Sequence, residues 1–185
     1  IFVVTGIGGG IIIDNKLYTG SGGVAGELGH MTIDSNGAIC GCGSRGCLEA
    51  VASKTGIQAE IKARIKRGED TDIKESLEKE GILKSGPLRA AYDKGDIVVR
   101  ETVERAAKYL GVGVANLINI FDPEAVVFGG GVIEELGDII LPMVKEEASR
   151  YAMRSIFENV KFEKAQLGDD AGIMGAFVLA QEGVK

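Results

Sequence analysis

The chain has 185 residues, a formal net charge of −6 and 45% hydrophobic residues. These values fit one large globular domain, or a core that carries an insertion, and they exclude disordered and collagen-like chains. No apolar run approaches the ~18 residues that a membrane-spanning helix needs. The negative charge argues against binding a polyanion through bulk electrostatics. Glycine is abundant, at 28 residues, which indicates tight turns or backbone that approaches phosphate groups.

The chain begins abruptly. Its first residue is Ile1, and residues 1–5 already have the pattern of a buried strand that leads into a glycine run. We expect no signal peptide before this strand. We therefore expect the chain to be a fragment of a longer, cytoplasmic protein.

Short apolar runs between turn residues predict strands near the start of the chain. We expect them at residues 1–4, 11–13, 17–19 and 30–33, with the second and third forming a hairpin. A helix is expected from about Cys47 to Arg67, because isoleucines repeat every four residues on one face. The polar stretch 68–95 predicts two short helices, at about 72–79 and 87–93, in a peripheral insertion.

Helices and strands alternate in the second half of the chain. Apolar residues recur every three or four positions over 96–121, which predicts a long helix with Asp96 as its N-cap. Asp122-Pro123 should end this helix. Further expected elements are a strand at 125–128, a helix, a second helix from Pro142 to about Ala152, a strand at 160–165, a turn at 168–172 and a last helix to about Gln181. This alternation predicts an α/β fold.

Cysteine and histidine are concentrated in one short segment. His30, Cys40, Cys42 and Cys47 lie within 18 positions, and the chain has no other cysteine or histidine. Three thiolates and one imidazole make a closed tetrahedral zinc site, and the glycines between them let the loop curl around one ion. The alternatives are buried free thiols and, because the number of cysteines is odd, less readily a disulfide or redox pair.

Two glycine runs are candidate phosphate sites. Gly6-Ile7-Gly8-Gly9-Gly10 follows a strand but matches neither a Walker A motif nor the dinucleotide fingerprint. Its backbone N–H groups could still face a phosphate. Gly129-Gly130-Gly131 lies between a strand and a helix, where anions bind well. Together with the turn at 168–172, these runs indicate a nucleotide cleft at the strand ends, although tight packing turns would explain each run singly.

Several segments resemble the ROK family of bacterial sugar kinases and sugar-responsive repressors. The resemblance spans nearly the whole chain, and its most specific parts are the Glu-x-Gly-His and Cys-x-Cys-Gly-x-x-Gly-Cys-x-Glu motifs. The segments that carry it are 6–10, 25–30, 40–49, 126–131 and 170–176.

The resemblance implies a two-lobed, actin-like ATPase/hexokinase (ribonuclease H-like) fold. This chain is similar to the larger C-terminal lobe alone, with a zinc loop at 34–49 and the peripheral insertion at 68–95. The smaller lobe, which is expected upstream, would carry the first phosphate loop, part of the sugar site and the aspartate that acts as catalytic base. The resemblance therefore implies that this chain alone does not phosphorylate a sugar, and that its final helix packs towards the missing lobe.

The resemblance also assigns roles to individual residues. It implies structural zinc on His30, Cys40, Cys42 and Cys47, and sugar hydroxyls on Glu27, His30 and Glu49. A carboxylate suits vicinal hydroxyls, and a zinc-bound imidazole can still donate from its second nitrogen; without the resemblance, the two glutamates would read as surface charges. Residues Thr5, Gly6, Gly8, Gly9 and Gly10 would face the ATP phosphates, and Gly129, Gly130 and Gly131 the nucleoside end.

One position departs from the family pattern. Family kinases usually have Gly-Thr-Gly at this point, whereas here Val4 precedes Thr5 and Gly6. A β-branched residue does not take a positive φ cheaply, so Val4 slightly favours a sensor. The intact Gly8-Gly9-Gly10 run is the kinase-like form.

Two functions follow from the resemblance. The first is the sugar- and nucleotide-binding lobe of an ATP- and Mg-dependent hexose kinase, glucokinase-like. The alternative is the effector-binding lobe of a ROK transcriptional regulator, which would contact nucleic acid only through an absent N-terminal domain. An unrelated zinc-stabilised scaffold is a third possibility. The expected partners are a small-molecule sugar, the missing lobe and a second copy in a homodimer, because the helix at 96–121 is apolar on more than one face; no membrane partner is expected.

Overall fold

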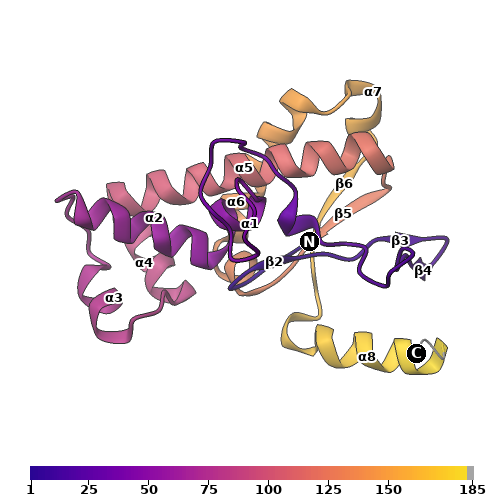
Figure 1. Cartoon of the computed structure of the whole chain (residues 1–185), viewed down its shortest axis with the longest axis horizontal. Helices are drawn as coiled ribbons and strands as arrows, with labels where there is room; N and C mark the ends of the chain where they lie inside the picture. The colour runs from indigo at the N-terminus through magenta and orange to yellow at the C-terminus, as the bar shows by residue number, and fades with distance from the viewer. Residues whose placement is uncertain (183–185) are drawn as a thin grey trace.

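Two long helices form the centre of the molecule. The structure is a computed structural model that describes residues 1–182. Helices α5 (Ile97–Phe121) and α6 (Gly131–Tyr151) pack along each other (Figure 1). Their apolar stripes supply much of the core through Val99, Val103, Val114, Ile118, Ile133, Leu136 and Val144. The periodicity of 96–121 therefore predicted one continuous helix correctly.

Four short strands lie in one row beside these helices. Strands β1 (Phe2–Val3) and β2 (Ile7–Gly8) pair antiparallel, and β5 (Ala125–Phe128) and β6 (Lys161–Lys164) pair parallel. A bridge from Phe2 to Gly129 joins the two pairs, so the order across the row is β2-β1-β5-β6. The parallel pair and its helical crossover confirm the predicted α/β class.

The predicted hairpin is present as β3 (Ile12–Ile13) and β4 (Lys16–Leu17), which pair antiparallel. Asp14 and Asn15 form its turn and both have positive φ, at 52° and 59°. Asparagine and aspartate tolerate this backbone better than other non-glycine residues. The turn residues of the sequence therefore located this hairpin.

The single helix expected from Cys47 to Arg67 is wrong, because Ser53 divides it. The structure has α1 (Leu48–Ala52) and α2 (Lys54–Lys66). Ser53 is extended and its hydroxyl accepts a hydrogen bond from the Gly56 N–H at 3.0 Å. Serine is a preferred N-cap for this reason. The Lys54 N–H donates to the carbonyl of Val4 instead of continuing the first helix.

The strand expected at 30–33 is also wrong. Residues Leu28–His30 form a 3-10 turn, η1, and only Thr32 makes a bridge, to Cys47. The partner of this segment is the irregular cysteine loop, whose tight turns leave no regular strand edge to pair with. Two backbone bonds make this bridge, from the Ile33 N–H to the Gly46 carbonyl and from the Leu48 N–H to the Met31 carbonyl.

The polar segment 68–95 forms two short helices, as predicted. They are α3 (Lys74–Glu80) and α4 (Ser85–Lys94), and each ends at a glycine with positive φ. Their buried side chains Leu77, Leu88 and Ala91, together with Leu83 between the two helices, join the same core cluster as α5 and α6.

Pro142 does not begin a new helix, in contrast to the prediction. It lies inside the continuous helix α6. A proline inside a helix removes one hydrogen bond and is unfavourable by about 3 kcal/mol. Ile140 and Val144, on either side of it, are both buried, so packing of this stretch outweighs the local preference.

The last elements are α7 (Arg154–Phe157), β6, the 3-10 turn η2 (Gly168–Asp170) and α8 (Ala171–Glu182). Helix α8 extends away from the rest of the chain (Figure 1) and exposes apolar side chains, Ile173, Met174, Phe177 and Val178. None of the helices within residues 1–182 is long and apolar enough to cross a membrane.

Asp96 is the N-cap of α5, as predicted, and its carboxylate accepts three hydrogen bonds. The donors are the Val99 N–H at 3.0 Å, the Asp72 N–H at 2.7 Å and the Thr71 hydroxyl at 2.6 Å. Burial would raise the pKa of Asp96, but these three bonds outweigh it and lower the pKa below its ordinary value. Asp96 therefore ties α5 to the segment that precedes α3.

We expect Asp96→Ala to lower the free energy of unfolding by about 2–4 kcal/mol at pH 7, since it removes a helix cap and leaves the hydroxyl hydrogen of buried Thr71 without its acceptor. Asp96→Asn is the control, because asparagine is a good cap, and should be milder. The folded-state pKa is depressed, so the stabilisation is complete above the unfolded pKa of about 3.9 and disappears as pH falls through the folded value. Urea unfolding at pH 7 and pH 3 measures this; an equal loss at both pH values would contradict it.

Candidate functional site

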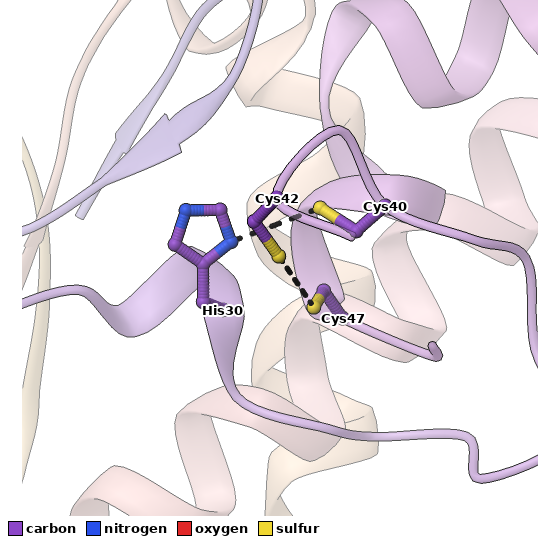
Figure 2. Close-up of side chains that lie close together, drawn as sticks. All are labelled: His30, Cys40, Cys42 and Cys47. Atoms are coloured by element: carbon purple, nitrogen blue, oxygen red, sulfur yellow. Dashed lines mark hydrogen bonds between the residues drawn. The ribbon is translucent and has the colours of Figure 1, made fainter. Parts of the chain in front are cut away.

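His30 and the three cysteines come together in the structure, as the sequence predicted (Figure 2). His30 ends η1, Cys40 and Cys42 lie in the loop that follows, and Cys47 is the N-cap of α1. Their four candidate ligand atoms all lie within 4.8 Å of one another. Residues up to 17 positions apart in sequence thus offer one imidazole nitrogen and three sulfurs to one point.

The distances between these atoms fit a tetrahedral ion. With Zn–S near 2.3 Å and Zn–N near 2.0–2.1 Å, the edges of the tetrahedron are about 3.8 Å between sulfurs and about 3.6 Å between sulfur and nitrogen. The Cys42 and Cys47 Sγ atoms are 3.8 Å apart, and the Cys40 Sγ is 3.7 Å from His30 Nδ1. The donor set and its spacing therefore suit zinc.

Backbone bonds shape the loop around this cluster. The Cys40 N–H donates to the Ser44 carbonyl at 2.8 Å, and the Gly46 N–H donates to Ala38 at 2.8 Å. Gly46 has a φ of 77°, and a Cβ there would overlap the Asp34 carbonyl. This glycine is therefore required by the close approach of two backbone segments.

The three thiols are in different environments. Burial raises the pKa of Cys40 and raises that of Cys47 to about 12, whereas the backbone and side chain of Ser44 help to lower the pKa of Cys42 to about 7. Cys42 is exposed and the other two are buried. A metal ion would reach the cluster from the side of Cys42 and displace the protons of the buried pair.

His30 is oriented so that its two ring nitrogens have different neighbours. Nδ1 faces Cys40, while Nε2 lies 3.6 Å from the Glu27 carboxylate. Glu27 is exposed and His30 is half-buried. The ring therefore presents one nitrogen to the metal cluster and the other to an exposed, acidic edge.

Glu49 lies between the cysteine cluster and the first glycine run, a position that the sequence did not predict. Its Oε2 accepts a hydrogen bond from the Ile7 N–H at 2.9 Å, and its Oε1 lies 3.6 Å from the Cys40 Sγ. Glu49 therefore contacts both candidate sites within this chain.

The two glycine runs flank the same strand. Phe2 of β1 pairs with Gly8 on one side and with Gly129 on the other. Adjacent strands lie about 4.8 Å apart, so the two runs are separated by β1 and by about 10 Å across the strand row. The structure thus places the two predicted phosphate regions on either side of one strand.

The glycines of the two runs differ in whether packing within the chain requires a residue without a side chain. A Cβ at Gly130 (φ 93°) would lie 2.6 Å from the Val3 carbonyl oxygen, and one at Gly129 would lie 3.0 Å from the Phe2 ring. Those two have packing reasons. A Cβ at Gly8 would meet nothing within 4 Å, and at Gly10 only Leu17 at 3.7 Å, so packing within the chain does not require glycine at these two exposed positions.

Val4 accommodates its place in the hairpin turn without strain. Over residues 1–182, the non-glycine residues with positive φ are Asp14, Asn15 and Asp122. Val4 therefore does not have a positive φ, so its β-branched side chain causes no backbone strain at this position. Its side chain instead packs beside Gly130, where an added Cβ would lie 2.9 Å from it.

Two further features were not visible in the sequence. The Tyr109 hydroxyl of α5 donates to Asp34 at 3.2 Å and ties the cysteine loop to the central helices. A cavity of about 520 Å³ adjoins Gly10 and Leu28 and reaches the end of α5 at Phe121. Residues 75 or more positions apart share no local sequence pattern, so the sequence alone did not predict these contacts.

Comparison with known proteins agrees with this geometry. The ROK family model matches residues 1–183. A glucokinase of Halalkalibacterium halodurans is 37% identical over 96% of this chain and 54% of its own length. A xylose repressor of Caldicellulosiruptor bescii is 38% identical over 94% of this chain and 43% of its own length.

A solved structure shows the same fold. The ROK family glucokinase of Streptomyces griseus, in complex with glucose and AMPPNP, superposes with a TM-score of 0.80 at 34% identity, covering 98% of this chain and 59% of that one. The fold is thus the actin-like ATPase/hexokinase type that the resemblance implied. The chain belongs to the ROK family. It spans about half the length of the relatives it matches.

Proposed function

We propose that this chain is the sugar- and nucleotide-binding lobe of an ATP-dependent ROK hexose kinase. The observation that carries the proposal is the open, exposed Gly8 and Gly10, in a run whose Ile7 N–H shares Glu49 with the metal cluster. Since packing within the chain gives no reason for glycine there, close approach of a ligand phosphate to the backbone is the better reason. The similarity to a glucokinase, at 37% identity over 96% of this chain, supports the proposal.

The proposed sugar site is the acidic edge of the metal cluster. Glu27, His30 Nε2 and Glu49 Oε1 face this region, and carboxylates accept hydrogen bonds from vicinal hydroxyls. Zinc held by His30 Nδ1 and the three cysteines would fix the imidazole ring and the loop 34–49. Zinc with four protein ligands has no open position, so its proposed contribution is structural.

The proposed reaction moves the γ-phosphoryl group of Mg-ATP to a sugar hydroxyl. Positioning and charge stabilisation supply most of the catalysis in such transfers. Within this chain, backbone N–H groups of residues 6–10 would hold the phosphates, with Thr5 at the edge of the turn, and Gly129, Gly130 and Gly131 would approach the nucleoside. The base would come from the lobe upstream.

The alternative is the effector-binding lobe of a ROK transcriptional regulator. The xylose repressor matches this chain as well as the glucokinase does, at 38% against 37% identity. In either case we propose a homodimer, which the exposed apolar side chains of α5, Ile97 and Ile120, support.

A coupled kinase assay of the intact protein across a panel of hexoses tests the proposal. We expect ATP-dependent turnover by the intact protein and none by residues 1–185 alone, because the proposed base would belong to the lobe upstream. Sugar binding without turnover, together with binding to a DNA site, would favour the regulator. Turnover by the isolated chain would contradict the assignment of this chain to one lobe.

A further inference from the structure

Glu49 is the one side chain that joins the metal cluster to the first glycine run among the hydrogen bonds described for residues 1–182. It lies in the first turn of α1, two residues after Cys47. One carboxylate oxygen accepts from the Ile7 N–H at 2.9 Å, and the other lies 3.6 Å from the Cys40 Sγ. The two oxygens thus face different sites.

The Ile7 N–H depends on this carboxylate. Ile7 is buried and pairs with Val3 on β1, yet its N–H is directed to Glu49. A buried N–H without an acceptor is unfavourable. Glu49 therefore provides the acceptor for the Ile7 N–H, directly before the exposed run Gly8-Gly9-Gly10.

Gly6 has a packing reason that involves the same carboxylate. A Cβ at Gly6 would overlap Glu49 Oε2. The φ of Gly6 lies outside the left-handed region. The glycine at this position is explained by the approach of the carboxylate and not by backbone strain. Gly6 and Glu49 are thus a matched pair, 43 residues apart.

We propose that Glu49 is a positioning residue through which the metal loop fixes the glycine run 6–10 for nucleotide phosphate. The carboxylate is carried on α1, whose N-cap is the candidate metal ligand Cys47, and it holds the Ile7 backbone. A displacement of the Glu49 carboxylate therefore reaches the phosphate loop through one side chain. This inference deepens the proposed function and rests on it only for the nature of the ligand.

Hydrogen exchange at the Ile7 amide tests the contact without any ligand. In the zinc-loaded chain, Glu49→Ala should speed exchange at Ile7 roughly 10- to 100-fold, because a bond to a charged acceptor is lost. Glu49→Gln keeps an acceptor oxygen of the same reach and should restore protection to within a few-fold. Glu27→Ala is the matched control, since it removes a carboxylate at the same edge that does not contact Ile7.

Gly6→Ala provides a second, independent variant. Its Cβ should displace the Glu49 carboxylate and speed Ile7 exchange as well, while adding Gly6→Ala to Glu49→Ala should cause little further change. Unchanged Ile7 exchange in both Glu49→Ala and Gly6→Ala would overturn the proposal. So would equal acceleration by Glu27→Ala.

Titration of the intact protein with AMPPNP tests the consequence for the ligand. Glu49→Ala should weaken AMPPNP binding about tenfold or more, whereas Glu49→Gln and Glu27→Ala should not. If the parent binds no AMPPNP but the exchange pattern holds, the nucleotide part of the proposed function fails and the positioning contact stands. If the parent binds AMPPNP and Glu49→Ala binds it equally, the positioning role is overturned.

Discussion

Cys42→Ser should reduce the zinc content of this protein from about one ion per chain to near zero and loosen the loop 34–49. Cys42 is exposed, so the substitution leaves the core unchanged and, with no metal, should alter stability by less than about 0.5 kcal/mol. With zinc bound, it removes one of four ligands. Because structural zinc sites form together with the fold, loss of a ligand should be strongly destabilising.

Elemental analysis of protein purified without added metal, beside thermal unfolding, measures the effect. Ser35→Ala is the matched control, because Ser35 is exposed in the same loop and is not one of the four candidate ligands. We expect it to retain zinc and most of its stability. Near-zero zinc in the parent protein with three titratable thiols, or an unchanged Cys42→Ser variant, would contradict the metal site.

The candidate metal site was predictable from sequence because its ligands are local. Cys40, Cys42 and Cys47 fall within one glycine-containing loop, so chain geometry alone keeps them close. His30 is only 10 positions away. The long amphipathic helix at 96–121 was predictable for a similar reason, since its period repeats over many turns.

Features that depend on distant contacts were not predictable. The Ile57, Ile61 and Ile65 period gave no sign that Ser53 would divide the helix, because the break is stabilised by the Lys54 bond to Val4, 50 positions away. Likewise, the bond between Glu49 and Ile7 has no local pattern. Local rules failed in the other direction at Pro142, where packing on α5 outweighs a helix-breaking residue.

At the proposed sugar site, substituting a carboxylate and substituting His30 should have different effects on zinc content. In the intact protein, Glu27→Ala should weaken sugar binding roughly 10- to 150-fold, because it removes a charge-assisted acceptor. Zinc content should not change, since Glu27 contacts only the outer nitrogen of His30. Glu49→Ala should weaken sugar binding by a similar factor and keep zinc, with the added change at Ile7.

His30→Ala should lose zinc, stability and sugar binding together. Its Nδ1 faces Cys40 and its Nε2 faces Glu27, so one ring serves both the metal and the proposed sugar edge. Calorimetric titration with sugar and zinc analysis of each variant separate these outcomes. Glu75→Ala, an exposed carboxylate on α3, is the control that should change neither. If Glu27→Ala and Glu49→Ala bind sugar like the parent, those carboxylates are surface charges; if His30→Ala keeps its zinc, the fourth ligand is another residue.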